Sequence, residues 1–213
     1  MFGKILSELL EAQYQAVGHP LTIVETGTMY YTTLEAGETT LDARSTFGIA
    51  QWIKKTGVKH AFHSVDFYSD HIESCKRALS QNGLDGIVEH HLCENAATAL
   101  RAFSFSMDFV LLDTAIEPEY TLDEYLAIYQ RIRRPGFVVI DDTHVPCGGQ
   151  IINKGSLAMP FAVNQQKLHV WEIVKEVGTQ RGEKCAVIPF GREAENIVQQ
   201  LPRWFEVTSQ LRG

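Results

Sequence analysis

The sequence predicts an α/β fold, in which a doubly wound, mostly parallel sheet of seven strands ends in a C-terminal antiparallel hairpin. Two observations support this prediction. Short apolar or β-branched runs alternate five times with amphipathic stretches, a pattern typical of a parallel sheet with helices on both faces. The C-terminal part then changes to two apolar runs joined by a turn, which is typical of a hairpin at a sheet edge.

The composition is that of one globular domain, and we expect residues 1–213 to form it. Of the 213 residues, 45% are hydrophobic and 21% are charged, and 19 Lys and Arg against 26 Asp and Glu give a net charge of −7. Such a surface repels polyanions, so a nucleic-acid partner is not expected. No apolar run is long enough to span a bilayer, so no membrane partner is expected either. The cysteines form no CxxC pair, which favours reduced thiols and a cytoplasmic location.

The N-terminal third begins with a helix, because apolar residues between Ile5 and Val17 recur at spacings of three and four. A strand at 22–28 follows and ends in a tight turn at Gly27. Residues 30–44 are polar and predict an inserted loop. Ser45 is a good N-cap for the next helix, 45–57.

The rest of the chain continues the alternation. The pattern predicts strands at 59–67, 87–94, 107–113 and 136–142, helices at 69–83, 95–103 and 121–133, and hairpin strands at 169–177 and 185–191. The organisation is therefore an N-terminal helix (1–19), a nucleoside-binding core (20–142) and a C-terminal part (143–213). Within that last part, the stretch 146–164 is either a lid over a substrate or a plain connection.

Functional residues are expected at the carboxyl ends of the parallel strands, because open α/β sheets bind their ligands there. In order along the chain, the candidate residues at these ends are Glu25, Gly27 and Thr28, then Asp66, then Glu94 and Asn95, then Asp113, and finally Asp141, Asp142 and His144.

Asp66 follows the second strand, where one carboxylate can accept hydrogen bonds from both hydroxyls of a nucleoside ribose. The alternative is that Asp66 caps the helix that begins near Ser69. A nicotinamide dinucleotide is disfavoured, because Gly27 is not part of a GxGxxG pattern.

Three acids, Asp113, Asp141 and Asp142, end adjacent strands and should lie close enough to share one cation. Oxygen ligands without Cys or His select a hard divalent ion, so the pattern predicts magnesium. The alternative is that one or two of these acids cap helices or bind loop amides.

These motifs resemble class I S-adenosylmethionine-dependent methyltransferases. The resemblance is carried by Glu25-Thr26-Gly27 after the first strand, STFGIAQWI at the start of the next helix, Asp66 in HSVDF, and LCENAATAL. The runs FVLLDTA and VVIDDTH are similar to the divalent-metal-dependent O-methyltransferases of the catechol and macrolide-sugar types. The resemblance implies a Rossmann-like fold, S-adenosylmethionine as cofactor, and magnesium held by Asp113, Asp141 and Asp142. The cofactor-binding residues that it implies are Glu25, Gly27, Thr28, Ser45, Asp66, Glu94, Asn95 and Asp113.

The expected activity is magnesium-dependent O-methylation of a small hydroxylated molecule, with Asp113 and His144 as catalytic residues. His144 is the candidate base, because Thr114 to Glu117 follow Asp113 where the catechol type has a lysine. Two alternatives stay open, a non-catalytic protein that binds S-adenosylmethionine and a nicotinamide-dependent oxidoreductase. A homo-oligomer is compatible with the apolar N-terminal helix.

Overall fold

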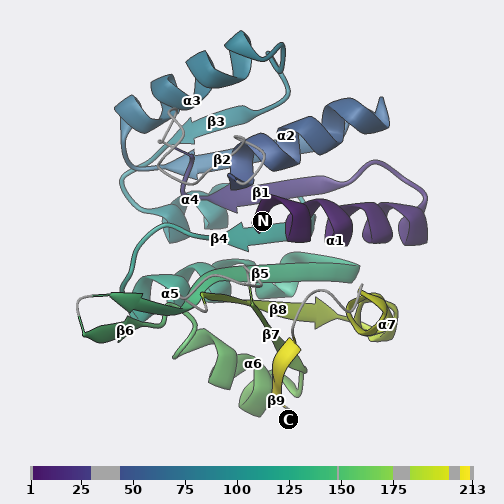
Figure 1. The fold of residues 1–213 in the computed structure, drawn as a ribbon, viewed down its shortest axis with the longest axis vertical. Coiled ribbons are helices and arrows are strands. Elements are labelled where there is room, and N and C mark those ends of the chain that lie inside the picture. The colour runs from purple at the N-terminus through teal and green to yellow at the C-terminus, as the bar shows by residue number, and fades with distance from the viewer. Residues whose placement is uncertain (1, 30–43, 148, 175–182, 202–206, 212–213) are drawn as a thin grey trace.

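A computed structural model describes residues 2–29, 44–147, 149–174, 183–201 and 207–211, and side chains are described except at 147 and 207–211. The described residues form one nine-stranded sheet with the strand order β3-β2-β1-β4-β5-β8-β7-β9, while β6 pairs with β5. Figure 1 shows helices on both faces of this sheet. The predicted Rossmann-like α/β fold with a C-terminal antiparallel pair is confirmed.

The strands β1 to β5 form the parallel part of the sheet, and β6 to β9 are antiparallel additions. Their bounds are β1 Thr22–Thr26, β2 Ala61–Asp66, β3 Glu89–Leu92, β4 Met107–Leu112, β5 Ile132–Cys147, β6 Gln150–Ile152, β7 Val170–Val174, β8 Lys184–Phe190 and β9 Val207–Leu211.

The helices are α1 Phe2–Val17, α2 Ser45–Thr56, α3 Ser69–Gln81, α4 Ala96–Ala102, α5 Pro118–Ile128, α6 Ala158–Gln166 and α7 Arg192–Gln200. Strand residues alternate between two apolar cores. For example, Ile23 packs in the core shared with α1, α2 and α7, and its neighbour Val24 packs in the core shared with α5 and α6. This alternation follows from the two-residue period of a strand that is buried on both faces.

The strand register brings the ends of the parallel strands to one edge of the sheet. Thr26 at the end of β1 is paired with Val65 in β2 and with Leu112 in β4. Leu112 in turn is paired with Ile140 in β5, and Asp66 in β2 with Leu92 in β3. The residues that follow these positions therefore share one rim, as predicted.

The boundary between the predicted helix at 121–133 and the following strand differs most from the prediction. The helical spacing of 121–133 continues into a strand, because β5 already begins at Ile132 and pairs there with Met107. Arg133 leaves the helical path and forms an ion pair with the buried Asp108, at 2.9 Å. A buried carboxylate needs such a partner, and this pairing overrides the local helical pattern.

The C-terminal third contains elements that the sequence pattern did not predict. The stretch 146–164 is neither a bare loop nor one connection, since it contains β6 and most of α6. Helix α7 and strand β9 are also additions. The predicted insert at 30–44 lies, except for Arg44, outside the described residues. Among the helices that are described, none combines the length and the apolarity needed to cross a bilayer.

Candidate functional site

The turn after β1 brings two strand ends into contact. Gly27 has a left-handed φ of 87°, and its N–H donates to the Val65 carbonyl at 2.8 Å. A Cβ at this position would lie 2.2 Å from the backbone oxygen of Asp113. Only glycine permits this approach, so Gly27 sets the distance between the ends of β1 and β4.

Glu25 is fully buried and holds the start of α2. Its carboxylate accepts hydrogen bonds from Ser45 Oγ at 2.6 Å, Thr46 Oγ1 at 2.7 Å and Ser64 Oγ at 3.0 Å. Two residues that the sequence assigned to the cofactor, Glu25 and Ser45, therefore bind each other. Their contact with a cofactor stays a prediction, and what the structure shows is a positioning role.

Burial raises the pKa of Glu25 to about 7, against the lowering effect of its three hydroxyl donors. A carboxyl whose pKa is raised in the folded state holds its proton there while the unfolded chain releases it. The free energy of unfolding therefore falls as the pH rises from about 4.5 to 7, by on the order of 3 kcal/mol for this group.

We expect the Glu25→Gln variant to lack this pH dependence. Urea unfolding from pH 5 to 8 should show wild type losing stability relative to the variant as the pH rises. A constant difference in unfolding free energy over this range would show that Glu25 is ionised throughout.

Asp66 lies at the end of β2, only 4% exposed, beside the glycine turn. Its Oδ2 accepts the Thr28 N–H at 2.8 Å and its Oδ1 accepts the Tyr68 N–H at 2.8 Å. Neither donor belongs to α3, so Asp66 does not cap that helix. The carboxylate instead joins the loops after β1 and β2, and Thr28 is placed directly against it.

The rim after β3 carries the other two residues assigned to the nucleoside. Asn95 is the N-cap of α4, where its Oδ1 accepts the Thr98 N–H at 2.9 Å. Glu94 precedes it and is exposed. Cys93 connects this loop to β2, because its N–H donates to the Asp66 carbonyl at 3.0 Å. Glu94 and Asn95 therefore directly follow a residue that is bonded to Asp66, and their contact with a nucleoside stays a prediction.

The three predicted metal ligands do meet. Carboxylate oxygens of Asp113, Asp141 and Asp142 all lie within 4.8 Å of one another. Asp141 is 7% exposed and its Oδ1 accepts the Asp142 N–H at 2.8 Å. Asp142 has a left-handed φ of 50°, which turns the chain at the end of the parallel region.

A lysine that the sequence reasoning missed enters this cluster. Lys154 Nζ lies 2.5 Å from Asp113 Oδ1 and 3.2 Å from Asp142 Oδ2, and its side chain is 5% exposed. Its backbone N–H also donates to the Asp142 carbonyl at 3.1 Å. The three acids therefore have a cation from the chain itself.

Burial alone would lower the pKa of Lys154, but the charges of Asp113, Asp142 and Asp141 outweigh it and hold that pKa above its ordinary value. Burial raises the pKa of Asp113 to about 7, with Lys154 acting in the opposite direction. Lys154 is thus charged at neutral pH. A divalent ion bound by these three acids would have to displace the ammonium from Asp113 and Asp142.

The sequence does hold a signal for Lys154. It is the one charged residue between His144 and Lys167. A lone lysine in such a segment, placed after a strand end rich in acids, indicates an internal counter-ion.

His144 lies two residues beyond Asp142 in β5, opposite Lys184 of β8, and is partly buried. His144 shares this strand with Asp141 and Asp142, but its proposed role as a base stays a prediction.

Another residue that the sequence reasoning missed is Glu124 of α5. It accepts hydrogen bonds from Thr26 Oγ1 at 2.9 Å and from Thr114 Oγ1, and burial raises its pKa to about 7.

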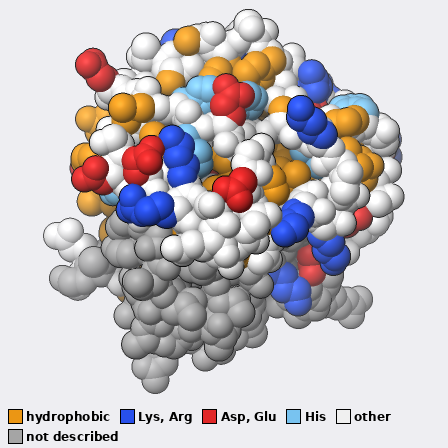
Figure 2. All heavy atoms as spheres, turned by 90° about the horizontal axis from the view of Figure 1, so that it is seen from above, with side chains coloured by type: hydrophobic (Ala, Val, Ile, Leu, Met, Phe, Trp, Pro, Cys, Tyr) orange, Lys and Arg blue, Asp and Glu red, His pale blue; other side chains and the backbone are white. Residues whose placement is uncertain are grey.

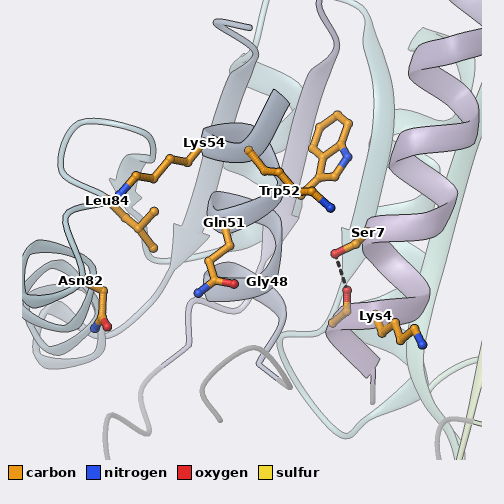
Figure 3. A pocket seen from close by; sticks show the side chains of 10 residues that line it. Lys4, Ser7, Gly48, Gln51, Trp52, Lys54, Asn82 and Leu84 are labelled. Carbon is orange, nitrogen blue, oxygen red and sulfur yellow. Dashed lines mark hydrogen bonds between the residues drawn. The ribbon is translucent and has the colours of Figure 1, made fainter. Parts of the chain in front are cut away.

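A cavity of about 690 Å³ lies away from this rim, between α1, α2 and the turn after α3. Figure 3 shows Lys4 and Ser7 on its α1 side, and Gln51, Trp52 and Lys54 on its α2 side. The strand-end residues described above do not line it, so it is not part of the candidate site.

Comparison with known proteins places this rim in context. Residues 44–143 match the model of a methyltransferase domain family. No curated protein sequence matches the chain. The match begins just before α2 and ends within β5, so it includes Asp66, Asp113 and the acidic pair.

Solved structures share the fold at low sequence identity. TomG, an O-methyltransferase from Streptomyces achromogenes solved with SAM, is 19% identical with a TM-score of 0.61, covering 89% of this chain and 79% of that one. Cofactor-bound Rv0187 from MTB is 16% identical with a TM-score of 0.60, covering 88% and 78%. A methyltransferase from Geobacter sulfurreducens is 11% identical with a TM-score of 0.54, covering 88% and 76%. The predicted likeness to methyltransferases is confirmed for the fold, and for the sequence over residues 44–143.

Proposed function

We propose that this chain, which carries a methyltransferase domain on a class I methyltransferase fold, transfers a methyl group from S-adenosylmethionine to a hydroxyl of a small molecule. The observation that carries the proposal is the rim itself. Three features lie at the ends of adjacent parallel strands, where ligands bind in such sheets. They are the turn at Gly27, the Asp66 carboxylate and the acid–lysine cluster, which consists of Asp113, Asp141, Asp142 and Lys154.

The residues at one half of the rim fit a nucleoside cofactor. Asp66 is a buried carboxylate that fixes the loop after β1 through the Thr28 N–H, and its other oxygen accepts the Tyr68 N–H and lies 3.3 Å from His71 Nδ1. A ribose with adjacent hydroxyls is the ligand that such a carboxylate recognises. Asn95 and Glu94 would border the adenine. When bound, S-adenosylmethionine would supply a methyl group on its sulfonium. The acceptor oxygen would take that methyl group, and S-adenosylhomocysteine would leave.

The other half of the rim would hold the acceptor. Lys154 neutralises part of the charge of Asp113 and Asp142 and fixes the turn at 153–155 against the end of β5. Two buried polar atoms in this segment, Thr143 Oγ1 and Asn153 Oδ1, have no hydrogen-bond partner among the residues that the structure describes. Buried acceptors of this kind suit a hydroxylated ligand, because an unpaired polar group is costly.

The chain's contribution to the reaction is mainly positioning. Rigid strand ends hold the two ligands in fixed relation, and this lowers the entropic part of the barrier. The acceptor hydroxyl loses its proton as the new carbon–oxygen bond forms, and His144 is our candidate to receive it. The magnesium ion predicted from the sequence stays a prediction. The cation beside Asp113 in the proposed reaction is Lys154.

Asp66→Asn tests the cofactor half of the proposal. Loss of a charged acceptor should weaken binding of S-adenosylhomocysteine by about 10- to 100-fold. Asp70→Asn is the matched control, because Asp70 is an exposed acid in the first turn of α3 and should leave the affinity unchanged. Equal affinities for the two variants, measured by calorimetry on folded protein, would remove Asp66 from the cofactor site.

A methyl-transfer assay tests the acceptor half. We expect labelled methyl groups from S-adenosylmethionine to appear on a compound in a panel of phenols, catechols and sugars. Cofactor binding without transfer to any hydroxyl, but with transfer to amines or thiols, would contradict O-methylation.

A further inference from the structure

A second cluster of side chains that could bind a metal ion lies apart from the acid–lysine cluster. His63 of β2 and Glu89 and His91 of β3 place one ligand atom each within 4.8 Å of the others. His63 is paired with Glu89 across the two strands, and His91 is two residues farther along β3, so all three side chains share one face of the sheet. Figure 2, which views the molecule from the α3 end of the sheet, shows histidine side chains beside acidic ones on that part of the surface.

The distances within the cluster suit a tetrahedral ion. His63 Nδ1 lies 3.1 Å from His91 Nε2 and 3.4 Å from Glu89 Oε2, and His91 Nε2 lies 3.6 Å from Glu89 Oε1. Ligands at zinc bond lengths of 2.0–2.1 Å in a tetrahedron lie about 3.3 Å from one another. The two histidine nitrogens are thus separated by about one edge of a zinc tetrahedron, and the two oxygens of Glu89 lie at similar distances, Oε2 from His63 and Oε1 from His91.

The imidazole rings are held in place from behind by aromatic rings. His63 stacks on Phe105 with a centroid distance of 4.7 Å, and His91 packs edge-on against Phe103 at 5.0 Å. Phe103 and Phe105 stack on each other at 4.8 Å. The histidines thus lose little conformational freedom on binding an ion, which is the condition for a preorganised site.

Access to solvent is on the Glu89 side. The side chain of Glu89 is 67% exposed, against 26% for His91 and 13% for His63. An ion can enter there, and a water molecule can complete the coordination. Two imidazole nitrogens and one carboxylate oxygen are ligands typical of zinc, whereas magnesium is bound mainly by oxygen ligands.

We propose that His63, Glu89 and His91 form a zinc site that joins the edge strand β3 to β2. The ligand atoms are His63 Nδ1, His91 Nε2 and a Glu89 carboxylate oxygen. The site differs from the acid–lysine cluster in both ligands and location, and it does not depend on the proposed methyl transfer. Its effect would reach the rim, because β2 ends in Asp66 and the loop after β3 is bonded to Asp66 through Cys93.

Calorimetry with Zn²⁺ on the chelator-treated full chain tests the proposal. We expect one ion per chain, no binding of Mg²⁺ at this site, and a higher melting temperature with zinc. His91→Ala and Glu89→Gln should each weaken zinc binding by at least about 100-fold, because loss of a direct ligand should cost no less than the 10- to 100-fold that changes to outer-shell partners cause. Both residues lie on an edge strand, so these variants should fold, and circular dichroism would verify this.

His169→Ala is the matched control. His169 lies 3.6 Å from Glu195 and offers a histidine–carboxylate pair that lacks a third ligand among the metal-ligating groups found in the described residues. Nitrogen-15 NMR of the imidazoles gives a second readout, in which zinc should shift His63 Nδ1 and His91 Nε2. Absence of zinc binding, or binding that the His91 and Glu89 variants leave unchanged, would overturn the proposal.

Discussion

Replacing Lys154 with Met is expected to destabilise the protein by about 3 kcal/mol at pH 8, because it removes the cation from a largely buried cluster of three acids. The loss should shrink as the pH falls, since protonation of Asp113, whose pKa is raised, removes part of the repulsion that Lys154 now offsets. Urea unfolding at pH 6 and pH 8 measures both effects. Lys167→Met, at an exposed lysine, is the control and should change the stability little.

The same variant tests whether Lys154 takes the place of a metal. Once the ammonium is gone, three carboxylates remain, and these are ligands that magnesium prefers. We expect Mg²⁺ to restore stability to the Lys154→Met variant and to leave wild type unchanged. Stoichiometric binding of Mg²⁺ by wild type, lost on Asp141→Asn, would show instead that the acids hold a metal with Lys154 present.

Replacing Gly27 with Ala is expected to cost on the order of 4 kcal/mol of stability and to abolish cofactor binding. A left-handed φ of 87° is unfavourable for alanine, and its Cβ would lie 2.2 Å from the Asp113 carbonyl oxygen, so the ends of β1 and β4 would have to separate. This shift would also move Thr28 away from Asp66.

Gly57→Ala is the matched control for Gly27→Ala. Gly57 has a similar φ of 66° at the end of α2, but a Cβ there has nothing within 4 Å. Its cost should be only the backbone term, about 1 kcal/mol. Equal stabilities of the two variants would show that contact with Asp113 does not constrain the turn.

The sequence predicted the rim well because strand ends depend on local patterns. Apolar runs such as FVLLD and VVIDD mark buried strands, and the first polar residue after each run lies at the carboxyl end of its strand. Asp66, Asp113 and Asp141 were therefore placed correctly without any knowledge of tertiary contacts.

The parts that the sequence did not predict depend on tertiary contacts. Lys154 reaches Asp113 across 41 positions of the chain, and its isolation among uncharged residues marks the lysine but does not identify its partner. Glu25 fits a ligand-binding motif, yet its carboxylate binds three hydroxyls of the protein itself. Similarly, the helical spacing of 121–133 gives no sign that Arg133 pairs with Asp108. Each case is a buried charge whose partner is distant in sequence.

Calorimetric titration of the full chain with S-adenosylhomocysteine, in Mg²⁺ and again in EDTA, tests the central claim most directly. We expect one-to-one binding with the same affinity in both buffers, because the rim holds the nucleoside through Asp66 and carries its own cation in Lys154. No binding in either buffer by folded protein would contradict the cofactor assignment. Binding that requires Mg²⁺ would contradict the role given to Lys154.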